Sequence, residues 1–165
     1  AAACGRCGRG HDEADVERCE GAYEEVLRAA SNLRDPMIRI QELSKCLDPE
    51  RVAEARHLMA THHLVQQTHV ALALAYREVK DHRARALHLR HALSSFLSWR
   101  PPPSPQLASL HVALGTALAQ AGEEGAEEEV GRGLDMQVVC GGEDSTAAKV
   151  TRKVLEGIRR GSKPP

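Results

Sequence analysis

The tetrapeptide His69-Val70-Ala71-Leu72 recurs 42 residues later in the chain as His111-Val112-Ala113-Leu114. The match continues in weaker form beyond the tetrapeptide, where Ala75 is equivalent to Ala117. A period of this length, filled with helical spacing, is typical of arrays in which pairs of helices stack side by side. We therefore predict an all-α fold built from antiparallel helix pairs, with the best repeats over 62–99 and 104–140.

The spacing of apolar residues in the first copy predicts two helices. The first stripe advances in steps of four and three residues and consists of Val65, His69, Leu72, Tyr76 and Val79. A second stripe follows a turn at 80–82 and consists of Ala86, Leu89, Leu93 and Phe96. Because so short a turn joins them, the two helices should pack antiparallel.

Three dipeptides mark further helix starts, namely Asp35-Pro36, Asp48-Pro49 and Ser104-Pro105. In each, the first side chain can accept a hydrogen bond from an unpaired amide, and Pro takes a position whose amide would be unpaired in any case. They predict helices over 36–47 and 49–61 and the start of the second repeat. With helices over 12–32 and 146–158, we expect eight helices in a domain spanning 12–160, followed by a disordered tail at 161–165.

The second helix of the second repeat has an unusual composition. It carries Gly125, Gly131 and Gly133, each of which costs a helix about 1 kcal/mol relative to Ala. We therefore expect it to be the least stable helix of the set. Its acidic run at 127–129 could bind a basic peptide or a metal, but we interpret it as a solvated helix face.

The composition indicates a single domain and limits the classes of partner. The chain has 165 residues, of which 42% are hydrophobic and only 2% aromatic, so Leu, Ala and Val must form most of the core. A net charge of −1 gives no electrostatic case for binding nucleic acid or a membrane surface. Five cysteines without a secretory leader indicate a reducing compartment, so we expect an intracellular protein of the cytoplasm or nucleus. Because the chain begins with Ala1 and not with Met, we interpret it as the C-terminal part of a longer protein.

Cysteines in the N-terminal segment 1–11 suggest a metal site. Cys4 and Cys7 form a CxxC knuckle, which can present two thiolates to one tetrahedral zinc ion. Zinc needs four ligands, and the nearby candidates are Cys19 and His11. The segment therefore predicts half of a zinc site, and two free surface thiols are the alternative.

The sequence offers little catalytic chemistry. It contains no P-loop, no dinucleotide-binding glycine motif, no HExxH motif and no nucleophile elbow. Nine histidines could indicate acid-base or metal chemistry, but His69 and His111 share one repeat position on a packed face, so we interpret them as structural. A catalytic histidine also needs an orienting carboxylate, and none lies at a suitable spacing. We therefore expect no catalytic and no cofactor-binding residue in this segment.

The first repeat resembles a tetratricopeptide helix pair. The resemblance rests on Leu72, Ala75-Tyr76, Asp81 and the apolar block at 86–93, whereas Arg85 replaces the Ala that is usual in that family. It implies that the helix pairs stack as a right-handed superhelical array.

The long repeat period narrows the resemblance to the arrays of kinesin light chains and to the C-terminal helical domains of SET and MYND domain lysine methyltransferases. His62-His63-Leu64, Thr68-His69 and Val139-Cys140-Gly141 are similar to the latter, over about 58–158. This implies a parent protein-lysine methyltransferase that uses S-adenosylmethionine, in which the present segment flanks the SET domain in cis, narrows the substrate cleft and binds partners. The SET residues that bind the methyl donor and the MYND zinc ligands are not in this segment, and only Cys4 and Cys7 could belong to a zinc site of that family.

Two other hypotheses stay open. The chain could be a free-standing helical-repeat scaffold that binds a peptide or protein partner in its concave groove. In that case the guanidinium groups of Arg77, Arg83 and Arg90 could meet acidic groups of the ligand. The chain could also be a degenerate copy of either protein, which the glycines of the second repeat suggest.

Overall fold

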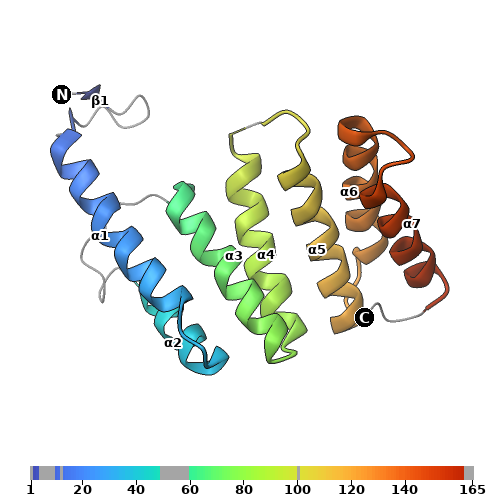
Figure 1. The fold of residues 1–165 in the computed structure, drawn as a ribbon, viewed down its shortest axis with the longest axis horizontal. Coiled ribbons are helices and arrows are strands. Elements are labelled where there is room, and N and C mark those ends of the chain that lie inside the picture. Colours follow the sequence, from blue (N-terminus) through green and yellow to red (C-terminus); the bar gives the residue numbers. More distant parts are fainter. Residues whose placement is uncertain (1, 4–9, 12, 49–59, 100, 162–165) are drawn as a thin grey trace.

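In the part of the chain that the structure describes, seven helices follow one another in a row of alternating direction (Figure 1). The computed structural model describes residues 2–3, 10–11, 13–48, 60–99 and 101–161. The helices are α1 (Glu13–Ser31), α2 (Pro36–Cys46), α3 (His63–Glu78), α4 (His82–Leu97), α5 (Pro105–Ala121), α6 (Ala126–Gly141) and α7 (Thr146–Arg159). Each helix packs against the next one in the chain. The predicted all-α class with antiparallel helix pairs is confirmed, whereas the right-handed sense of the superhelix stays a prediction.

Some predicted elements, near the ends of the chain and between α2 and α3, lie largely outside the described residues. Most of the helix expected over 49–61 lies outside the described residues. The same is true of the tail expected at 161–165, of which only residue 161 is described. At the N-terminus, β1 (Ala2–Ala3) and β2 (Gly10–His11) pair antiparallel, which the sequence did not predict. The first described helix begins at Glu13 and the last ends at Arg159, and the domain limits of 12 and 160 stay a prediction.

Capping residues determine where the helices start and stop. Asp35 Oδ1 accepts a hydrogen bond from the Met37 amide at 2.8 Å and opens α2, as predicted. Ser104 Oγ likewise accepts from the Leu107 amide at 3.2 Å at the start of α5. At the other end of α5, Gly122 takes the left-handed conformation with φ of +72°, which glycine adopts without steric cost. Short-range chemistry therefore fixes the length of these helices.

Two hydrophobic clusters fill the interior. The first joins α1, α2 and α3 and contains Tyr23, Leu27, Ile40, Leu43, Leu64 and Leu72. The second joins α3 to α6 and contains Leu89, Leu93, Leu107, Leu114 and Leu118. Within the first cluster the completely buried Tyr23 hydroxyl donates to Thr68 Oγ1 at 2.9 Å, because the Thr68 hydroxyl itself donates to the Leu64 carbonyl. This bond stabilises the α1–α3 contact by about 1 kcal/mol.

The predicted apolar faces are correct at most positions and wrong at some. Val26 on α1 and Val150 on α7 are 40% and 56% exposed, although both are apolar residues within amphipathic helices. On α3, Leu64 and Thr68 are fully buried, whereas the predicted stripe started one residue later. The reason is that α3 packs against α1 and α2 as well as against α4, so its buried surface is wider than a single stripe.

Two glycines allow the backbones of α5 and α6 to approach closely. A Cβ atom at Gly115 would lie 2.7 Å from the Ala126 carbonyl oxygen, and one at Gly133 would lie 2.8 Å from the Ala108 carbonyl oxygen. Such distances are shorter than real Cβ contacts, so no other residue fits without moving a helix. A Cβ at Gly131, by contrast, would meet nothing within 4 Å. Helix propensity alone predicts that Gly131 and Gly133 both destabilise α6. The close packing of α6 against α5, however, requires a glycine at position 133.

The two glycines of α6 therefore predict opposite effects of the same substitution. Gly133→Ala should lower the free energy of unfolding by about 1–3 kcal/mol, because the added methyl group pushes α6 away from α5. Gly131→Ala should raise it by about 0.5–1 kcal/mol, because Ala loses less backbone entropy than Gly in a helix. Urea denaturation of both variants beside the wild type checks this. A Gly133→Ala variant as stable as the wild type would contradict the close approach of the two helices.

Candidate functional site

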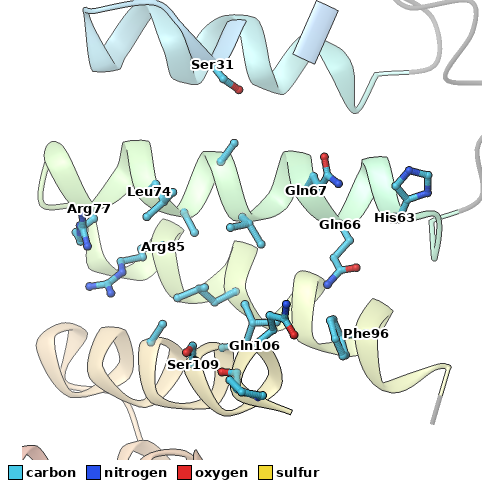
Figure 2. A pocket seen from close by; sticks show the side chains of 17 residues that line it. Ser31, His63, Gln66, Gln67, Leu74, Arg77, Arg85, Phe96, Gln106 and Ser109 are labelled. Carbon is cyan, nitrogen blue, oxygen red and sulfur yellow. Dashed lines mark hydrogen bonds between the residues drawn. The ribbon is translucent and has the colours of Figure 1, made fainter. Parts of the chain in front are cut away.

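An open groove of about 1040 Å³ lies on the face formed by α3, α4 and α5 (Figure 2). Most of its wall comes from α3 and α5, and α1 contributes only its last residue, Ser31. The lining residues are Ser31, His63, Gln66, Gln67, Val70, Ala71, Ala73, Leu74, Arg77, Arg85, Leu89, Phe96, Pro105, Gln106, Ser109, Leu110 and Ala113. The groove therefore combines an apolar floor with amide and guanidinium groups.

Helical spacing explains why α3 and α5 both contribute a face to the groove. On α3, Val70, Leu74 and Arg77 follow one another at intervals of four and three residues, so they lie on one side of the helix. On α5, Gln106 and Ala113 are two turns apart on the side that faces them. Leu74 is 48% exposed, so the groove presents a large apolar side chain to solvent. An extended chain could lie between these two helices.

Positive charge is concentrated at one end of the groove. Figure 2 shows Arg77 and Arg85 together at this end and His63 at the opposite end. The guanidinium of Arg85 is buried and donates to Gln120 Oε1 at 2.9 Å. Burial lowers the pKa of Arg85, and the neighbouring Arg77 lowers it further. Arg77 itself is exposed and has no ion-pair partner among the described residues.

The structure places the three arginines predicted to bind a partner in different surroundings. Arg77 lines the groove, but Arg83 and Arg90 on α4 do not. Arg90 instead pairs with Glu123, with Nη2 and Oε2 3.0 Å apart. Sequence reasoning missed Arg85 as a groove residue. Its signal was a large basic side chain at a position where the tetratricopeptide pattern has Ala.

Most of the cysteine site predicted from the sequence cannot be placed. Cys4 and Cys7 lie outside the described residues. The backbone of His11 belongs to β2, and Cys19 is a half-buried free thiol on α1. Zinc binding by Cys4 and Cys7 therefore stays a prediction.

His69 and His111, which are equivalent in the repeats, both contact the second helix of their own pair. His111 is 2% exposed, and its Nδ1 lies 2.7 Å from Glu129 Oε2. His69 Nδ1 lies 3.0 Å from His88 Nδ1, and the ring of His91 stacks on His69 with centroids 4.9 Å apart. Their interpretation as packing residues agrees with these contacts.

Two histidines have a carboxylate partner that no spacing in the sequence indicated. Glu129 pairs with His111, and Glu20 Oε1 lies 2.8 Å from His62 Nε2. Both pairs join residues of different helices, so the spacing in the sequence gave no sign of them. In the acidic run interpreted as a solvated helix face, Glu127 and Glu128 are exposed and pair with Arg159 and Arg132 at the surface.

Comparisons of the sequence with known proteins do not assign the chain to a family. No family model matches the chain, and no curated protein matches it. Among the described residues, no helix has the length and apolar character that crossing a membrane requires. The groove and its charges are therefore the observations from which a function can be argued.

The histidine cluster of α3 and α4 predicts a loss of stability in mild acid. Burial and the neighbouring His88 and His91 lower the pKa of His69 from 6.5 to about 4, and burial also lowers that of His88. The folded chain therefore favours the neutral rings, whereas the unfolded chain takes up protons near pH 6.5. This contribution to stability is complete above pH 6.5 and is lost progressively as the pH falls toward 4.

Melting temperatures between pH 6.5 and 5, a range above the usual carboxylate pKa values, measure this effect. The wild type should lose stability steadily, and His69→Gln should show a flatter profile. Equal slopes for the two proteins would show that His69 does not lower the number of protons bound by the folded chain.

Proposed function

We propose that the chain is a helical-repeat domain that binds an extended segment of a protein partner in the groove between α3 and α5. The observation that carries the proposal is an apolar groove of about 1040 Å³ that ends at the exposed guanidinium of Arg77. Helical arrays commonly use such concave surfaces to hold peptides. The partner segment should carry an acidic group, because Arg77 and Arg85 concentrate positive charge at one end of the groove.

The lining supplies three kinds of contact for such a segment. Leu74 and Leu110 offer apolar surface for its side chains, and Gln67 and Gln106 offer amide groups that can hydrogen-bond its backbone. Arg77 can form a bidentate pair with a carboxylate, which is stronger and more directional than a contact with a neutral acceptor. Apolar contacts therefore supply most of the affinity, and Arg77 contributes the preference for acidic segments.

We also propose the parent in which this domain works, a protein-lysine methyltransferase of the SET and MYND domain type. Support comes from the sequence resemblance over about 58–158 and from the row of antiparallel helix pairs. In such a protein the domain would lie beside the SET domain in cis, narrow the substrate cleft and bind partners inside the cell, while S-adenosylmethionine and the catalytic residues belong to the SET domain. A free-standing scaffold is the alternative, and the groove serves it equally well.

The size of the native protein distinguishes these two proposals. An antibody raised against this segment should detect a product much larger than 18.0 kDa, and peptide sequencing of that product should find a SET domain upstream. A product near 18.0 kDa would leave the scaffold and exclude the methyltransferase.

Selection from a displayed library of random peptides tests the groove itself. The selected peptides should be rich in Asp and Glu. Arg77→Ala should weaken their binding by at least about tenfold, because the variant loses its charged hydrogen bonds to the peptide, as measured by fluorescence anisotropy. Leu74→Asp should abolish binding, because it places a charge on the apolar floor. Both side chains are exposed, so neither substitution should disturb the fold.

Matched substitutions outside the groove provide the controls. Arg83→Ala removes an exposed arginine from α4, and Leu87→Asp adds a charge at a leucine that is 50% exposed. Both variants should bind the selected peptides as the wild type does. If the control substitutions weaken binding as much as Arg77→Ala and Leu74→Asp do, the peptides bind elsewhere and the groove is not the site.

A further inference from the structure

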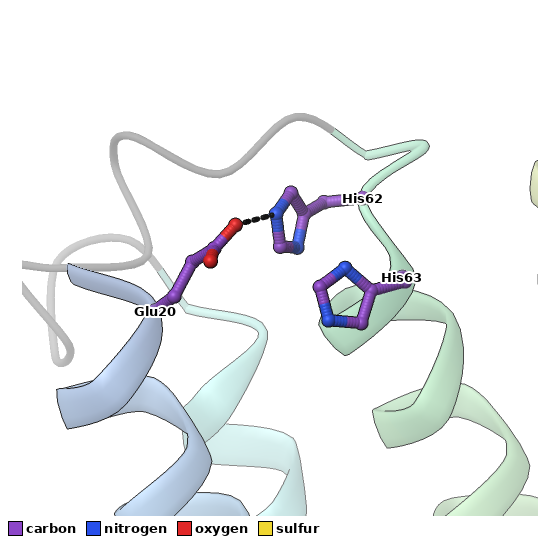
Figure 3. Close-up of side chains that lie close together, drawn as sticks. All are labelled: Glu20, His62 and His63. Atoms are coloured by element: carbon purple, nitrogen blue, oxygen red, sulfur yellow. Dashed lines mark hydrogen bonds and ion pairs between the residues drawn. The ribbon is translucent and has the colours of Figure 1, made fainter. Parts of the chain in front are cut away.

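Three side chains that could share a metal ion converge where α1 passes the start of α3 (Figure 3). Glu20 belongs to α1, His62 caps α3 and His63 is the first residue of α3. His62 Nε2 lies 2.8 Å from Glu20 Oε1, and the two imidazole centroids are 4.4 Å apart. One possible ligand atom from each residue lies within 4.8 Å of those of the other two.

The fold holds these donors in position. His62 has extended backbone angles, with φ of −67° and ψ of 142°, just before the chain enters α3. Glu20 lies one turn before Tyr23, whose buried hydrogen bond to Thr68 fixes α1 against α3. The approach of Glu20 to the two histidines is therefore a consequence of helix packing, and only a small movement is needed to bring three donors onto one ion.

The donor set indicates the class of ion. Two imidazole nitrogens and one carboxylate oxygen suit Zn²⁺ and similar transition metals, whereas Mg²⁺ and Ca²⁺ prefer oxygen ligands throughout. The side chains of His62 and Glu20 are 21% and 34% exposed, so an ion can reach them from solvent. Three protein ligands leave one tetrahedral position for a water molecule.

The hydrogen bonds of His62 determine which ring nitrogen carries the proton that a metal ion would replace. His62 Nδ1 accepts a hydrogen bond from the Leu64 amide at 3.3 Å, so the ring proton is on Nε2 and is donated to Glu20. An ion bound at Nε2 takes the place of this proton between the imidazole and the carboxylate. The proton then occupies Nδ1, and the long bond from Leu64 is lost. Formation of the site therefore replaces two hydrogen bonds, the one between His62 and Glu20 and the weak capping bond from Leu64, by metal ligation.

We propose that Glu20, His62 and His63 bind a divalent transition metal ion of the Zn²⁺ class and that this ion links α1 to α3. The site is distinct from the cysteine site predicted from the sequence, because it uses none of the thiols. It does not depend on the groove binding a peptide, although His63 contributes to both. Because the ligands come from two helices, the ion binds the folded chain in preference to the unfolded one and stabilises it.

Zinc titration of the full chain tests the proposal, in a background in which Cys4, Cys7 and Cys19 are replaced by Ser. Isothermal calorimetry should find one Zn²⁺ per chain, with a higher melting temperature in Zn²⁺ and no change in Mg²⁺. His63→Ala and Glu20→Gln should each weaken binding by at least about tenfold, the loss caused even by outer-shell changes at metal sites. His91→Ala removes another exposed imidazole and should leave the affinity unchanged.

Two outcomes would overturn the proposal. One is Zn²⁺ binding that is equally strong after His63→Ala and Glu20→Gln, which would place the ion elsewhere. The other is the absence of Zn²⁺ binding in the background that lacks Cys4, Cys7 and Cys19, which would assign any zinc to those three thiols. Circular dichroism of each variant verifies that its helices are intact, and His63 is exposed, so its replacement tests ligation and not packing.

Discussion

Within the described part of the chain, the closest approach of two helix backbones that glycine permits is between α5 and α6, at Gly115 and Gly133. Only 2% of the residues are aromatic, so the core has few large side chains with which to fill space between helices. The helices pack by close approach of their backbones. Glycine permits this between α5 and α6, and fully buried alanines such as Ala75 and Ala86 permit it at other contacts. The other side of α5 forms one wall of the groove.

How much the sequence predicts depends on the range of the interaction involved. Helix starts such as Asp35-Pro36 and Ser104-Pro105 were predicted correctly, because a cap and its amide are two or three residues apart. Repeat periodicity also predicted the order of the helix pairs. The Arg85–Gln120 and Glu20–His62 contacts could not be predicted, because each depends on how two separate helices pack. The groove follows from the same packing, so of its charged lining only Arg77 was anticipated.

The two copies of the repeated tetrapeptide have diverged in the partner of their histidine. In the second copy His111 is buried and pairs with a carboxylate, Glu129. In the first copy His69 meets the imidazoles of His88 and His91, which favour its neutral form. The same residue at the same repeat position therefore forms a charge-compatible pair in one copy and a cluster of like bases in the other. A repeat in the sequence conserves the place of a side chain more closely than its electrostatic surroundings.

The groove also differs chemically between its two ends. Arg77 and Arg85 lie at one end and His63 at the other, and the intervening floor is apolar. A chain lying along this floor in one direction and the same chain reversed would place different groups against the guanidinium and the imidazole. The two orientations therefore differ in free energy. The groove distinguishes the two directions of a bound chain, so a bound segment should have a single direction and a single register.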